Sequence, residues 1–170
     1  CLDKTGTLTF GRPKVYQVHP VALSDGDELL SLAAAMEQDS THPIANAIKE
    51  AAAERNIVPF TQPLVINHVV AKGLEARYGT TQDERPARRI RLGSYVFAEE
   101  LIPTCYKARV REVIEKIQLR GHIGVIIAAE APPPAAGEQQ DESLAQCAVI
   151  IMADSLRPGT TTLVETLHGM

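Results

Sequence analysis

Apolar and polar residues follow two periods along the chain, one typical of strands and one typical of helices. Residues 14–23, KVYQVHPVAL, are rich in β-branched side chains and predict a strand that leads into a loop. Three more strands are expected in LVINHVVAKG, LEARYG and RRIRLGS, because glycine-containing turns separate them. HIGVIIAAE and CAVIIMAD are apolar runs of strand length. The pattern predicts roughly six strands, mostly antiparallel in order.

In much of the remaining sequence, apolar residues recur at the spacing of a helix. A first helix is expected to take Ser24 as its N-cap and to end before Glu37. Pro43 suits the first residue of a second helix, where its missing N–H costs nothing. Residues 106–120 have one apolar face and predict a third helix, and a fourth is expected in the closing TTTLVETLHGM. These elements together predict an α+β fold, with a sheet flanked by helices.

Composition narrows the class of protein. The chain has 170 residues, of which 45% are apolar and 22% charged, and this is typical of a globular domain. Its net charge of -4 disfavours a nucleic-acid partner, since such surfaces are usually basic. Three scattered cysteines form no C-x-x-C pair, and the histidines show no ligand spacing, so neither a disulfide framework nor a metal site is expected. The apolar runs are too short to cross a bilayer.

The segment Asp3-Lys4-Thr5-Gly6-Thr7 has the residue types that phosphoryl transfer needs. A carboxylate at the end of a strand can attack a γ-phosphate, while a lysine and hydroxyls hold the transferred group. The full heptapeptide DKTGTLT resembles the phosphorylation motif of P-type ATPases. That resemblance implies Asp3 as the phosphorylated residue, with Lys4 and Thr5 assisting phosphate and Mg²⁺ contacts.

A second motif, Ser-Thr-His-Pro-Ile-Ala at residues 40–45, follows Glu37. Beside DKTGTLT it resembles the His-Pro motif of the heavy-metal-transporting P-type ATPases. The resemblance implies that ATP binds here. Glu37 would accept a hydrogen bond from the adenine amino group, and His42, before Pro43, would orient the nucleotide at a helix N-terminus.

Glycines in the strand region resemble the pattern with which this family lines its adenine pocket. Gly73 and Gly79 match the pattern, whereas Ala71 stands where the family has a glycine. Leu74 follows Gly73, and the pair Gly93-Ser94 resembles a Gly-Asn pair in the family. Without the resemblance, glycines between strands indicate hairpin turns.

A fourth motif, Asp154-Ser155-Leu156-Arg157-Pro158, is similar to the family's D-x-x-R-P hinge. The resemblance implies that the chain returns there from the nucleotide-binding domain to a phosphorylation domain of the haloacid-dehalogenase kind, an α/β fold. Asp154 would help to close the hinge, and Arg157 would lie near the nucleotide phosphates. Taken from the residues alone, the motif is a strand end followed by a turn.

The domain division follows from these motifs. Residues 1–13 and 151–170 are expected to be edges of the phosphorylation domain, with the nucleotide-binding domain, residues 14–150, inserted between them. Little strand precedes Asp3, and the family's later Mg²⁺-binding segment is not in the sequence, so the phosphorylation domain and its Mg²⁺ site are expected to be incomplete. We therefore expect this chain to bind ATP or ADP and to hydrolyse ATP hardly at all.

The resemblance also implies partners and location. The chain would be a monomeric cytoplasmic part of an integral membrane pump, and it would work with the actuator, the phosphorylation domain and the membrane helices of the same protein. Two other functions stay open. One is a soluble haloacid-dehalogenase-type phosphatase whose insert is a cap domain, although a cap needs no adenine pocket. The other is a regulatory module that senses nucleotide.

Overall fold

A computed structural model describes residues 9–21, 24–79, 87–132, 134 and 137–156. Six strands form one sheet in the order β1-β6-β5-β4-β3-β2, and every pair of neighbours is antiparallel. The predicted sheet is confirmed. The strands are β1 (Thr9–Val21), β2 (Val65–Val69), β3 (Gly73–Tyr78), β4 (Arg88–Gly93), β5 (Ile123–Ala129) and β6 (Gln146–Leu156).

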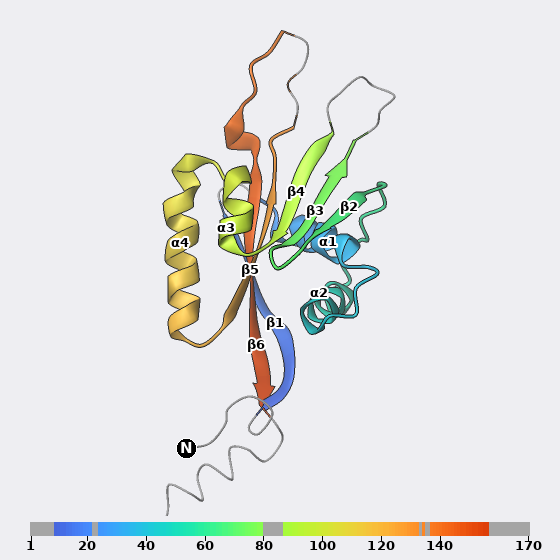
Figure 1. The fold of residues 1–170 in the computed structure, drawn as a ribbon, viewed down its shortest axis with the longest axis vertical. Coiled ribbons are helices and arrows are strands. Elements are labelled where there is room, and N and C mark those ends of the chain that lie inside the picture. Colours follow the sequence, from blue (N-terminus) through green and yellow to red (C-terminus); the bar gives the residue numbers. More distant parts are fainter. Residues whose placement is uncertain (1–8, 22–23, 80–86, 133, 135–136, 157–170) are drawn as a thin grey trace, which may run out of the picture.

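Two pairs of helices cover the two faces of this sheet (Figure 1). On one face lie α1 (Gly26–Met36) and α2 (Pro43–Glu54), and on the other lie α3 (Tyr95–Ala98) and α4 (Thr104–Leu119). Short 3₁₀ turns cover Glu99–Leu101 and Glu142–Leu144. Three helices and the flanking arrangement match the sequence prediction, whereas α3 was not predicted because four residues are too few to show a helical period. The closing helix predicted for residues 160–170 lies outside the described part.

Each sheet face has its own hydrophobic core, because successive side chains of a strand point to opposite faces. In β5, Val125 and Ile127 pack beneath α1 and α2, while Ile126 and Ala128 pack beneath α3 and α4. The apolar faces predicted for the helices lie in these cores, including Ile48 of α2. The middle of the sheet is therefore buried on both sides.

The first helix begins one residue later than the sequence suggested. Asp25, rather than Ser24, is the N-cap, and its carboxylate accepts hydrogen bonds from the N–H groups of Asp27 and Glu28 at 2.9 and 3.3 Å. The Ser24 hydroxyl instead accepts from the N–H of Cys147 in β6 at 3.0 Å. The prediction of a serine cap was wrong because this long-range bond engages the serine oxygen, which a local motif cannot reveal.

Strands β1 and β6, which pair at one edge of the sheet, each run across a predicted domain boundary. β1 and β6 pair from Thr9 opposite Leu156 to Val21 opposite Cys147. The same ladder therefore joins residues assigned by sequence to the inserted domain and residues assigned to its edges. Within the part of the chain that the structure describes, none of the helices has the length and apolar character that a bilayer span requires.

Candidate functional site

A cavity of about 640 Å³ opens at the end of the sheet where β3 and β5 begin and β4 ends. Its floor is apolar and includes Leu74, Leu92 and Val125, which face α1 and α2. The loop between α1 and α2 and the turn between β2 and β3 form its sides. A cavity of this size is in the range of small-molecule sites, which combine an apolar surface with a few placed polar groups.

Most of the predicted nucleotide-binding residues meet in this cavity, although they come from four separate stretches of the chain. Pro43 and Gly79 do not line it. Gly79 follows the far end of β3, and a strand of six residues spans about 20 Å, so this glycine lies well away from the cavity. The predicted residues that line the cavity are Glu37, His42, Ala71, Gly73, Leu74, Gly93 and Ser94.

Glu37 caps the C-terminus of α1 and is half-buried at the cavity. Burial raises the pKa of its carboxyl above the ordinary value, because the charged form loses solvation. A hydrogen bond from Ser40 and the positive charges of His42 and His68 act in the opposite direction and lower that pKa. The carboxylate therefore lacks full solvation and gains from a ligand that donates a hydrogen bond to it.

His42 is the N-cap of α2, and its Nδ1 accepts a hydrogen bond from the N–H of Ile44 at 3.2 Å. When the ring is neutral, Nε2 must then carry the proton and act as its donor. The His42 carbonyl also accepts from the N–H of Asn46 at 3.0 Å, and Pro43 has no N–H. The N–H groups of Ile44 and Asn46 at this helix N-terminus are therefore already bonded. An anion bound there would be stabilised mainly by the helix dipole rather than by hydrogen bonds from free N–H groups.

Lys49 holds the α1–α2 loop in place from outside the cavity. Its ammonium group donates to the carbonyl oxygen of Ser40 at 2.7 Å and to that of Gln38 at 3.5 Å. The Ser40 hydroxyl in turn accepts from the N–H of His42 at 3.3 Å. These bonds fix the separation between Glu37 and His42, since both residues flank the loop.

The glycines of the site allow two backbones to approach closely. Gly73 and Gly93 are paired across β3 and β4. A Cβ at Gly73 would lie 2.1 Å from the Leu92 carbonyl oxygen, and one at Gly93 would lie 2.3 Å from that of Lys72. Ala71, in the turn before Gly73, has φ of 60°. This left-handed conformation is unfavourable for alanine and explains physically why glycine suits the position.

Ser94 caps the short helix α3, where its hydroxyl accepts from the N–H of Phe97 at 3.4 Å. Its own N–H donates to the Lys72 carbonyl oxygen at 3.4 Å. Ser94 therefore joins β4, α3 and the β2–β3 turn at the edge of the cavity. This structural role was not predicted from the sequence.

Sequence reasoning missed several residues that line the cavity. His68 was set aside because no metal-ligand spacing surrounds it, yet it lies in β2 beside the site. Lys72 lies between the motif positions Ala71 and Gly73 and was given no role. Ser40 begins the His-Pro motif, but no role of its own was predicted for it. Gly124 comes from β5, about 80 residues after His42, so only the fold brings them together.

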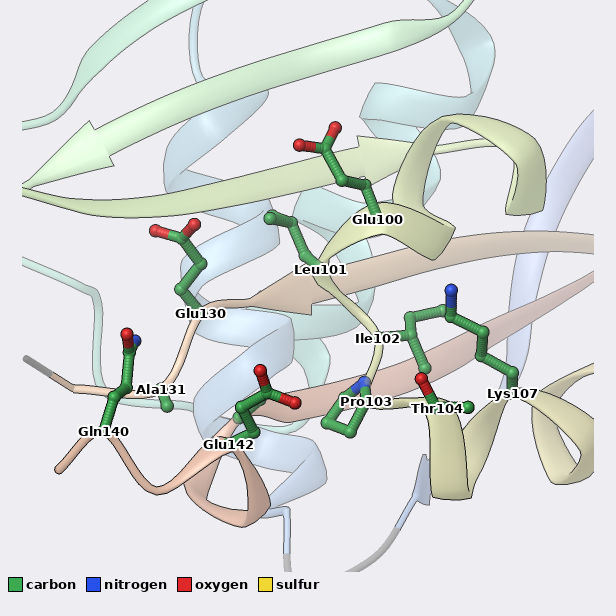
Figure 2. A pocket seen from close by; sticks show the side chains of 11 residues that line it. Glu100, Leu101, Ile102, Pro103, Thr104, Lys107, Glu130, Ala131, Gln140 and Glu142 are labelled. Carbon is green, nitrogen blue, oxygen red and sulfur yellow. The ribbon is translucent and has the colours of Figure 1, made fainter.

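A second cleft, of about 310 Å³, opens beside α4. Figure 2 shows the carboxylates of Glu100, Glu130 and Glu142 around it, with Lys107 across from Glu130. Arg89 pairs with Glu100 and Glu130, and Arg91 pairs with Glu100, so the charge of these two carboxylates is already largely compensated. Among the described residues that line the cleft, Lys107 is the one cationic side chain. The cavity beside Glu37 instead contains one carboxylate together with Lys72 and two histidines, and its charge suits an anionic ligand better.

Of the predicted phosphorylation and hinge residues, only Asp154 is in the described part of the chain. Asp3, Lys4, Thr5 and Arg157 lie outside the described residues. Asp154 lies in β6, opposite Pro13 of β1. No group of three His, Cys, Asp or Glu side chains that could hold a metal ion occurs among the residues with described positions.

A family model for haloacid dehalogenase-like hydrolases matches residues 1–170. The chain belongs to this haloacid dehalogenase-like hydrolase family. The family assignment is consistent with the DKTGTLT segment, in which an aspartate is the expected nucleophile.

Curated relatives of this haloacid dehalogenase-like chain are heavy-metal P-type ATPases. The zinc/cadmium/lead-transporting P-type ATPase of Escherichia coli is 45% identical over 76 residues, which cover 44% of this chain and 10% of the relative. The probable cadmium-transporting ATPase of Alkalihalophilus pseudofirmus is 31% identical over 172 residues, covering 99% and 21%. The chain thus spans about a tenth to a fifth of the length of these relatives.

Solved structures of metal-transporting P-type ATPases are also similar to this chain. A zinc-transporting PIB-type ATPase matches with a TM-score of 0.65 and 26% identity, over 98% of this chain and 23% of that one. The N-domain of HMA8, a copper-transporting P-type ATPase, matches with a TM-score of 0.55 and 18% identity, over 80% of this chain and 97% of that one. The second match shows a shared fold over most of this chain.

Proposed function

We propose that this chain is the ATP-binding part of a metal-cation-transporting P-type ATPase, and that the nucleotide binds in the cavity beside Glu37. The observation that carries the proposal is the convergence of Glu37, His42, Gly73 and Gly93 on one cavity. These residues were selected by motif alone, and they come from segments separated by up to about 55 residues. The relatives, which are metal-transporting ATPases, support the same function.

The cavity suggests how each part of ATP is held. The adenine ring lies on the apolar floor that includes Leu74 and Leu92, and its amino group donates to the Glu37 carboxylate. That hydrogen bond compensates a half-buried acceptor that has lost water. His42 donates through Nε2, and Lys72 provides positive charge for the phosphates.

In the whole pump, the bound ATP is delivered to Asp3. One carboxylate oxygen of Asp3 attacks the γ-phosphorus, the bond from that phosphorus to the β–γ bridging oxygen breaks, and ADP leaves. Water then cleaves the aspartyl phosphate to restore Asp3 and release phosphate. We assign Lys4 and Thr5 to phosphate contacts, Arg157 to the nucleotide phosphates and Asp154 to the hinge.

Mg²⁺ would accompany ATP in this reaction and neutralise phosphate charge. Its expected ligands are not among the residues that the structure describes. The pump would include actuator, phosphorylation and membrane parts outside this chain, and this chain would face the cytoplasm. We expect the chain alone to bind nucleotide and to hydrolyse it hardly at all.

Isothermal titration of the chain with ATP, with and without Mg²⁺, tests the proposal. We expect saturable heat in both conditions, and no heat at millimolar ATP would contradict ATP binding. A matched pair of lysine variants locates the site. Lys72→Ala should weaken ATP binding several-fold, because Lys72 lines the cavity, whereas Lys107→Ala in the second cleft should not change it. The reverse result would move the site to the second cleft.

A further inference from the structure

His68 lies on the side of the sheet that faces Glu37 and His42. In the pairing of β2 with β3, His68 stands directly opposite Leu74. Residues directly opposite each other in an antiparallel pair have their side chains on the same face. Leu74 is buried in the core beneath α1 and α2, so the His68 side chain projects toward that same side. It lines the cavity together with Glu37 and His42.

His68 also acts on the Glu37 carboxylate. Its positive charge is among the influences that lower the pKa of Glu37 against the effect of burial. Both side chains line the same cavity, so one ligand can contact both of them. His68 itself is exposed, and none of the side-chain hydrogen bonds among the described residues involves its ring. Its ring can therefore donate to a ligand without breaking an existing bond.

We propose that His68 is a specificity-determining residue that donates a hydrogen bond to N1 of the adenine ring while Glu37 accepts from the adjacent 6-amino group. This inference rests on the proposed function. Adenine presents a donor next to an acceptor on this edge, and the Glu37–His68 pair offers the complementary acceptor and donor. Guanine presents the reverse order, an acceptor at O6 and a donor at N1. The pair therefore selects adenine over guanine, since guanine would leave both groups mispaired.

Calorimetric titration with ATP and with 1-deaza-ATP, in which N1 is replaced by a C–H group, tests this proposal on the whole chain. We expect His68→Ala to weaken ATP binding about five- to tenfold, the loss of one hydrogen bond. It should leave 1-deaza-ATP binding unchanged, because that nucleotide has no acceptor for His68. Asn67→Ala is the matched control, since Asn67 is an exposed neighbour on the same strand and points to the opposite face.

The outcomes separate this proposal from the proposed function. The assignment of His68 would be overturned if His68→Ala bound ATP with the original affinity. It would also be overturned if this variant lost affinity for ATP and for 1-deaza-ATP by the same factor. In both cases the proposal that the chain binds ATP would stand. If the unaltered chain bound no ATP, the proposed function would fail, and this inference with it. If His68→Ala does not fold, the unaltered chain still decides, because it should bind 1-deaza-ATP about five- to tenfold more weakly than ATP. Equal affinities would overturn the inference.

Discussion

Gly73 lies directly opposite Gly93 in the β3–β4 pairing, and neither position has room for a side chain. Each added Cβ would approach a backbone carbonyl oxygen of the facing segment to between 2.1 and 2.3 Å. Such a clash involves backbone on both sides, and a change of rotamer cannot relieve it. The two strands thus meet beside the cavity with no side chain between them, and this close approach shapes the cavity edge.

Gly93→Ala should destabilise the chain by about 3 kcal/mol, since the strand must shift away from the Lys72 carbonyl oxygen. Urea unfolding followed by circular dichroism measures the loss. Gly26→Ala is a suitable control because its added Cβ would have ordinary contacts, the nearest at 3.4 Å. We expect that variant to stay within about 0.5 kcal/mol of the original chain. Equal stability of the two variants would contradict the packing described at Gly93.

Ala71→Gly should stabilise the chain by about 0.5–1 kcal/mol, because glycine adopts the left-handed conformation at this turn without strain. Thermal and urea unfolding would show the gain. The opposite change in stability is expected for Ala53→Gly, an exposed position within α2, where glycine should cost about 1 kcal/mol. A loss at both positions would mean that Ala71 is not strained.

His42 has two separable roles, as the N-cap of α2 and as a nucleotide ligand. His42→Ala should lose about 1 kcal/mol of stability and also weaken ATP binding, because both the cap and the Nε2 donor disappear. His42→Ser keeps a capping oxygen, so it should retain the stability and still bind ATP weakly. Unfolding and calorimetry on the two variants distinguish the roles. Normal ATP affinity in either variant would contradict the role of His42 as a ligand.

Glu37→Gln should weaken ATP binding about tenfold, since the variant loses a charged acceptor for the adenine amino group. It should also change the pH dependence of stability. Because burial raises the pKa of Glu37 in the folded chain, the associated stability is complete below the unfolded pKa and is lost as the pH rises through the folded pKa. As the pH rises above the unfolded pKa of glutamate, about 4.3, the free energy of unfolding should therefore fall less for Glu37→Gln than for the original chain.

The control for that experiment is Glu115→Gln, an exposed position on α4 outside the cavity. This change should alter neither ATP affinity nor the pH dependence of unfolding. If Glu37→Gln and Glu115→Gln gave the same pH profile, burial of Glu37 would not contribute measurably to stability.

The sheet and the longer helices could be predicted from the sequence because their apolar periods are local. Ile48 of α2 and Val125 of β5 lie in segments whose patterns predicted a helix and a strand, and both side chains are buried. The exchange of roles between Ser24 and Asp25 could not be predicted, since the Ser24 hydroxyl accepts from Cys147, 123 residues away. The order of the strands also depends on such long-range pairings, which a local period does not specify.

The candidate site was predicted in part, and the reason differs from residue to residue. Glu37 and His42 were predicted through a motif in which they lie close in sequence, and both line the cavity. Gly79 was placed in the same pocket by its motif, but β3 carries it to the opposite end of the strand. His68 belongs to no motif, so the sequence did not predict it as a site residue. Its position opposite Leu74 in the β2–β3 pairing places its side chain on the cavity side of the sheet.

Mapping of ATP binding by backbone amide NMR tests the central claim most directly. On titration of the labelled chain with ATP, the largest saturable shifts should occur at Glu37, His42, Gly73 and Gly93, whose amides surround one cavity. Amides of the second cleft, such as those of Glu100 and Glu142, should change little. Saturable shifts centred on the second cleft, or the absence of saturable shifts at millimolar ATP, would contradict the account.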